Sequence, residues 1–120
     1  MIGVISDTHG LLRPEAIEAL RGVEHILHAG DEKLAGDIRA LWKQALIVNR
    51  PGRPRDQIGA DVASGLADLE AYGQLVLANP DFVARVKAAA PMNEADRASF
   101  FGGAAPGYTD YPALEAARAA

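Results

Sequence analysis

Cysteine is absent from this sequence of 120 residues, which excludes disulfide bonds, a thiol nucleophile and cysteine-ligated metals. No stretch approaches the roughly 18 apolar residues that a membrane-spanning helix needs, and the first residues lack the pattern of a secretory signal. Positive charge is not in excess either, because the formal net charge is −4, which disfavours binding to a nucleic-acid backbone. We therefore expect a cytoplasmic chain whose partners are neither nucleic acid nor membrane.

Length and bulky apolar residues are also in short supply. A chain of 120 residues forms one modest domain, whereas a complete (β/α)₈ barrel takes about 200 residues or more. Alanine supplies 24 residues of the 49% hydrophobic fraction. The sequence thus predicts a small core.

Alternating β-rich and helical patterns predict an α/β fold of four βα units. The expected strands are Ile2–Ser6, His25–Ala29, Ala45–Asn49 and Ala67–Tyr72. The expected helices are Arg13–Arg21, Lys33–Gln44, Arg55–Ser64 and Phe82–Ala89, with Leu34, Ile38, Leu41, Phe82, Val83 and Val86 facing inward. Helical crossovers make neighbouring strands parallel, so we expect a short parallel sheet resembling part of a TIM barrel. Its open edges favour self-association. An irregular tail follows residue 90, and a helix is expected at Ala113–Ala120.

Three polar residues follow the first two predicted strands. Asp7 and His9 come after the first strand, and Asp31 comes after the second. Parallel neighbours would bring these side chains to one edge of the sheet, where open α/β sheets bind ligands. Carboxylates and imidazole suit Mn, Fe or Zn, so a divalent metal is one hypothesis. The alternative is that the two aspartates cap helices and His9 is an ordinary loop residue.

The segments Ile2–Gly10 and His28–Asp31 resemble the opening of calcineurin-like metallophosphoesterases, with their Asp-x-His and Gly-Asp motifs. The resemblance implies that Asp7 and His9 bind a first metal and that Asp31 bridges two metals. The family's later histidines have no counterpart, because no histidine follows His28. His25 and His28 are interpreted as packing or rim residues. The metal site is therefore expected to be incomplete.

From about residue 33 the sequence resembles the C-terminal part of the old yellow enzymes, which are FMN-dependent ene-reductases, or NAD(P)H:flavin oxidoreductases, built on a (β/α)₈ barrel. The matching strings are Asp37–Leu41, Leu46–Asn49, Gly65–Asp68, Tyr72–Gln74, Ala78–Phe82, Ala90–Asn93 and Tyr108–Pro112. The resemblance implies that this stretch corresponds to the last two βα units and the tail. The family's catalytic His pair and proton-donating Tyr lie on earlier strands, which are not matched here.

In that family the ends of strands seven and eight hold the flavin phosphate. The resemblance implies a weak or vestigial FMN site formed by Asn49, Arg50, Gly52, Gly73 and Gln74. Two departures weaken it, because Pro51 has no amide hydrogen and Gln74 replaces the family's arginine.

We interpret the chain as composite. Residues 1–31 form a metallophosphoesterase-like head, and residues 32–120 form an old-yellow-enzyme-like barrel segment with its tail, together in one compact unit. Three functions stay open at this point: an FMN-binding oxidoreductase segment that is inactive alone, an incomplete metal-dependent phosphoesterase, and a non-catalytic scaffold. Flavin phosphate or a small-molecule substrate is the expected partner.

Overall fold

The computed structural model describes residues 1–6, 11–30, 32–102 and 104–114. Two compact units divide the chain, and we call them the sheet unit, Met1–Ala71, and the tail unit, Tyr72–Ala120. The sheet unit contains β1 (Ile2–Ser6), α1 (Pro14–Ala19), β2 (His25–Ala29), α2 (Glu32–Leu41), β3 (Ala45–Asn49), a 3-10 turn at Arg55–Gln57, α3 (Ala60–Ala63) and β4 (Leu69–Ala71). The tail unit contains α4 (Gln74–Ala78), α5 (Phe82–Lys87) and a 3-10 turn at Arg97–Ser99.

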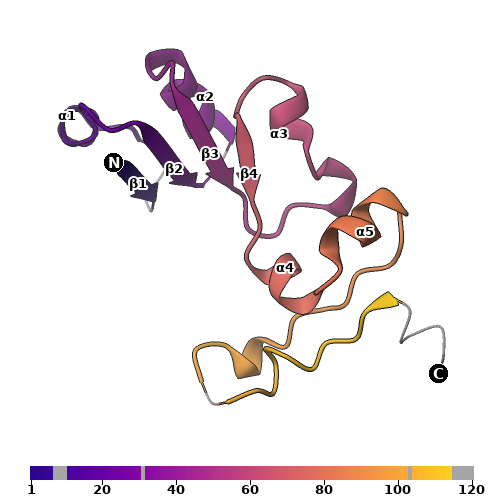
Figure 1. Cartoon of the computed structure of the whole chain (residues 1–120). Coiled ribbons are helices and arrows are strands. Elements are labelled where there is room, and N and C mark those ends of the chain that lie inside the picture. Colours follow the sequence, from indigo (N-terminus) through magenta and orange to yellow (C-terminus); the bar gives the residue numbers. More distant parts are fainter. Residues whose placement is uncertain (7–10, 31, 103, 115–120) are drawn as a thin grey trace. The chain divides into compact units, whose positions relative to one another are not determined.

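The four strands form one parallel sheet in the order β1-β2-β3-β4 (Figure 1). Each of the first three strands is followed by a helix that returns the chain to the start of the next strand, as parallel pairing requires. The register places Val4 beside Leu27, Leu27 beside Ile47, and Ile47 beside Leu69. The predicted α/β class and parallel sheet are confirmed.

The hydrophobic core lies on one face of this sheet. Alternate strand residues point into it, as the two-residue period of a strand dictates, and α2 covers them with Leu34, Ala35 and Ile38. The strand and loop residues of the core are Ile5, Val23, Ile26, Leu46, Val48 and Ala67. Among the described residues the opposite face has no such cover, since Ile2, Val4 and Leu69 remain exposed.

Several local predictions need correction. The expected helix over 55–64 is a 3-10 turn and a four-residue helix, because Gly59, with φ at +82°, separates the two. Leu41, Val83 and Val86 are exposed rather than inward, since Trp42, the residue after α2, packs against the core instead and α5 buries Arg85. The helix α4 was not expected. The predicted helix at Ala113–Ala120 lies largely outside the described residues.

Polar contacts hold the tail unit together. Arg85 is buried, and it donates to Asp81 Oδ1 at 2.5 Å and to the carbonyl oxygens of Pro91 and Pro112 at 2.6 and 2.7 Å. Asn79, also buried, exchanges hydrogen bonds with the backbone of Asn93. These contacts tie two stretches of the tail, residues 91–93 and Pro112, to the pair of helices α4 and α5.

Candidate functional site

The carboxyl end of β3 carries the first part of the expected phosphate site. Asn49 ends the strand, and its Nδ2 donates to the carbonyl oxygen of Ala71 at 3.0 Å. Its own carbonyl accepts from the Gly30 amide at 3.2 Å. Gly52 turns the following loop with φ at +74°, and a Cβ added there would meet nothing within 4 Å. The loop therefore leaves β3 through a turn that favours glycine.

Arg50 and Arg53 converge on one buried carboxylate of α3, that of Asp61. Arg50 Nε lies 2.5 Å from Asp61 Oδ2, and Arg50 Nη2 lies 3.2 Å from Oδ1. Arg53 makes a second forked pair through Nη1 and Nη2, at 2.7 and 2.9 Å. Both arginine side chains are 12% exposed and that of Asp61 is 4% exposed. A phosphate would therefore have to compete with the Asp61 carboxylate for these two arginines.

A second carboxylate completes this network. Glu70 of β4 lies 3.4 Å from Arg53 Nη1 and accepts hydrogen bonds from the amides of Gly59 and Asp61 at 2.6 and 2.7 Å. Two arginines and two acids leave the cluster formally neutral. Burial raises the pKa of Asp61, but hydrogen bonds and charge from Arg53 and Arg50 outweigh it, so the pKa lies below its ordinary value. Asp61 therefore stays ionised and holds both arginines.

Gly73 and Gln74, the second part of the expected site, belong to the tail unit. Gly73 precedes α4, and Gln74 is its first residue. A Cβ added at Gly73 would meet nothing within 4 Å, so the backbone is open to a close approach. The first amides of a helix have no acceptor inside it. This stretch thus offers neutral donors and no cation.

The predicted metal ligands Asp7, His9 and Asp31 lie outside the described residues. Within the part of the chain that the structure does describe, no group of three or more His, Asp or Glu residues is placed to hold a metal. His25 is exposed, whereas His28 is fully buried with no hydrogen-bond partner for its ring among those residues. A Cβ at Gly30 would lie 2.7 Å from the His28 ring, so this glycine makes room for the imidazole.

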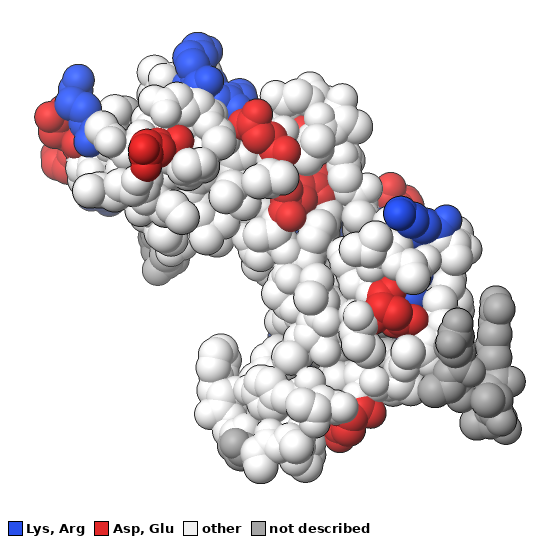
Figure 2. Space-filling model, in the orientation of Figure 1, with Lys and Arg blue, Asp and Glu red and all other residues white. Residues whose placement is uncertain are grey.

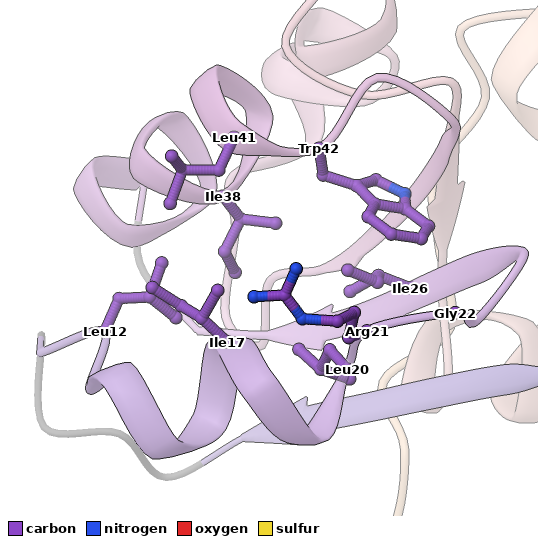
Figure 3. Close-up of a pocket in the computed structure, with 9 residues that line it drawn as sticks. All are labelled: Leu12, Ile17, Leu20, Arg21, Gly22, Ile26, Ile38, Leu41 and Trp42. Atoms are coloured by element: carbon purple, nitrogen blue, oxygen red, sulfur yellow. The ribbon is translucent and has the colours of Figure 1, made fainter.

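A cavity of about 210 Å³ lies elsewhere, between α1 and α2 (Figure 3). Its wall is apolar apart from Arg21, which pairs with Glu18. The lining residues are Leu12, Ile17, Leu20, Arg21, Gly22, Ile26, Ile38, Leu41 and Trp42. The sequence did not predict this cavity, because its lining residues come from separate segments of the chain, around α1, β2 and α2.

Charge over the surface is mixed. Figure 2 shows basic and acidic side chains near one another on the face in view, without a broad basic patch. No helix among the described residues has the length and apolar character to cross a membrane.

Comparisons with known proteins match the two resemblances seen in the sequence. Residues 1–49 match the calcineurin-like phosphoesterase superfamily domain. A 12-oxophytodienoate reductase 1 of Oryza sativa subsp. japonica is 42% identical over 89 residues, which are 72% of this chain and 23% of the rice protein. A probable flavin mononucleotide-dependent alkene reductase of Leishmania infantum is 51% identical over 51 residues, 42% of this chain and 14% of that protein.

Solved structures match over a longer stretch. Morphinone reductase superposes with a TM-score of 0.67 at 31% identity, covering 84% of this chain and 29% of the reductase. Over most of its length, this chain is a segment of the old yellow enzyme family. A variant of the Zymomonas mobilis old yellow enzyme homologue superposes with a TM-score of 0.75 at 22% identity. The match covers 94% of this chain and 42% of the variant, and at this identity it supports the fold alone.

This chain corresponds to only a small part of a whole enzyme of the old yellow enzyme family. It spans less than a quarter of the length of the rice reductase, and its four parallel strands correspond to part of a barrel. The phosphoesterase match reaches residue 49, beyond the predicted junction at residue 31. The boundary between the head and the barrel segment stays a prediction.

Proposed function

We propose that this chain holds FMN weakly through its phosphate and does not complete an ene-reductase reaction on its own. Support comes from its similarity to a reductase described as flavin mononucleotide-dependent and from the open backbone at Gly73. Asn49, Arg50 and Gly52 would line the β3 side of the site, and Gly73 with Gln74 would supply neutral donors. When bound, FMN supplies hydride transfer.

The observation that carries the proposed weakness is the pairing of Arg50 and Arg53 with Asp61. A phosphate is held best by charge-assisted hydrogen bonds, and these two cations already serve a buried carboxylate. Pro51 offers no amide hydrogen, and Gln74 offers a neutral amide. The site therefore offers hydrogen-bond donors to a phosphate but little net positive charge to attract it.

The test is a titration of flavin fluorescence with FMN and with riboflavin, which lacks the phosphate. We expect FMN to bind in the millimolar range and riboflavin to bind more weakly. The Gln74→Arg variant adds a cation at the phosphate and should tighten FMN binding about tenfold, with riboflavin unchanged. Gln74→Glu is the matched control and should weaken FMN binding. Equal binding of the two flavins, or none at millimolar FMN, contradicts the proposal.

A second candidate is an incomplete metal-dependent phosphoesterase, which the family match over residues 1–49 favours. Asp7, His9 and Asp31 would bind a divalent ion such as Mn, Fe or Zn. Binding of Mn²⁺ by the chain, measured by calorimetry, should be lost in Asp7→Ala. Hydrolysis of an aryl phosphate that depends on Mn²⁺ and on Asp7 would assign a reaction. A chain that binds neither Mn²⁺ nor FMN would leave the scaffold interpretation.

A further inference from the structure

The face of the sheet away from the core is largely apolar and carries no Asp, Glu, Lys or Arg among the described strand residues. The side chains on it are those of Ile2, Val4, Ser6, His25, Leu27, Ala29, Ala45, Ile47, Asn49, Leu69 and Ala71. Val4, Leu27, Ile47 and Leu69 make one continuous apolar row across all four strands. Val4 is 65% and Leu69 57% exposed. Parallel sheets occur almost only with both faces covered, so this face needs a partner.

Both edges of the sheet lack a neighbouring strand among the described residues. β1 pairs only with β2, and β4 pairs only with β3. Four parallel strands are half of the eight that close a (β/α)₈ barrel, and the sheet matches part of such a barrel. A second copy would supply four more strands of the same direction if β4 of each copy lay beside β1 of the other.

We propose that two copies of this chain associate through these edges into a closed eight-stranded barrel, with the row from Val4 to Leu69 buried inside. The face is self-complementary because it carries no Asp, Glu, Lys or Arg that a second copy would repel. A two-fold axis along the barrel makes the two junctions identical, as expected for a homodimer. Four strands about 4.8 Å apart and five residues long cover only about 300 Å², well below the roughly 800 Å² per partner of a standard interface. The dimer is therefore weak.

The first test is the molar mass of the full chain by sedimentation equilibrium up to millimolar concentration. We expect a monomer–dimer equilibrium that Val4→Lys and Leu69→Lys each abolish, because a lysine would be buried in the barrel. Both positions are exposed in the single copy, so its fold should survive, which circular dichroism checks. Leu41→Lys is the matched control, since Leu41 is 63% exposed on α2, away from this face. It should leave the equilibrium unchanged.

The second test uses the absence of native cysteine. Mixed Val4→Cys and Leu69→Cys chains should form a disulfide-linked dimer on oxidation, whereas neither variant alone should do so. Val4 and Leu69 of one copy lie three strands apart, about 14 Å, which is too far for an internal disulfide. A wild-type monomer at millimolar concentration overturns the proposal. So do efficient cross-linking of either variant alone, which indicates pairing of like edges, and loss of the dimer in Leu41→Lys.

Discussion

The sheet unit and the tail unit are stabilised by different kinds of interaction. In the sheet unit nine buried apolar residues form one cluster between the strands and α2, and the strands supply the backbone hydrogen bonds. In the described part of the tail unit the one fully buried apolar residue is Ala78. Arg85, Asn79 and their carbonyl partners replace the missing core.

This difference explains why the tail unit carries specific sequence strings such as Asn-Pro-Asp at residues 79–81. Apolar burial is non-directional and tolerates exchange among similar residues. A forked guanidinium that reaches Pro91 and Pro112, by contrast, needs its partners at fixed positions and angles. The Asn-Pro-Asp string at residues 79–81 supplies two such contacts, through Asn79 and through Asp81, which also accepts from the Leu114 amide at 2.8 Å.

The largest effect should follow from replacing Arg85 by Met. The change keeps an aliphatic chain but removes the donors to two carbonyls and leaves Asp81 without its cation, at an expected cost of about 3 to 5 kcal/mol. Hydrogen exchange should show amides of the tail unit exposed while those of β1 to β3 stay protected. The matched control is Lys87→Met, an exposed neighbour on α5. Equal protection of the tail in both variants would contradict the comparison.

A somewhat smaller effect, about 3 kcal/mol, should follow from Leu46→Ala in β3. Leu46 is fully buried, so the truncation loses burial and leaves a cavity. Chemical denaturation should report the loss, and hydrogen exchange should place it in the strands. Leu69→Ala in β4, measured at low concentration, is the control on the exposed face and should cost little. A loss as large for Leu69 as for Leu46 would mean that both faces are covered in the single chain.

The sheet was predictable from the sequence, and the polar network of the tail was not. The short β-rich runs Ile2–Ser6, His25–Ala29 and Ala45–Asn49 predicted the first three strands with their observed bounds, because the pattern of a strand is local. Arg85 was missed because its partners lie 4, 6 and 27 residues away, and no local period encodes them. The signal that remained was the cluster of rare strings at residues 79–81, 91–93 and 108–112.

The expected phosphate site was only partly predictable from the sequence. The positions of Asn49 and Gly73 near the ends of two strands follow from the βα pattern, whereas the helix α4 that begins directly after Gly73 does not. The capture of Arg50 and Arg53 by Asp61 does not, since Asp61 reads as an ordinary polar residue of a short helix. Only the fold shows that Asp61 is buried and lies beside Glu70 of β4.

The smallest expected effect concerns acid, and it sharpens the comparison because both units hold aspartates whose pKa is lowered, Asp61 and Asp68 in the sheet unit and Asp81 in the tail unit. In the sheet unit burial raises the pKa of Asp61, but hydrogen bonds and charge from Arg53 and Arg50 lower this pKa by a larger amount. In the tail unit the hydrogen bond from Arg85 is the main cause of the lowered pKa of Asp81. A carboxyl whose pKa is lower in the folded state stabilises the fold above its unfolded value, about 3.9. That contribution is lost as the pH falls through the folded value.

We therefore expect both units to lose protection below about pH 4, and single substitutions to separate them. Asp61→Asn removes the anion that holds Arg50 and Arg53, so the sheet unit should be less stable at neutral pH but should lose less on acidification. The tail unit of this variant should keep its full acid response, since Asp81 and Arg85 are untouched. Asp56→Asn, at an exposed position in the same loop region, controls for the loss of one negative charge. Hydrogen exchange at neutral and acidic pH measures both units in one sample. If the sheet unit responds to acid identically in Asp61→Asn and in wild type, the buried network around Asp61 is not what acid disrupts.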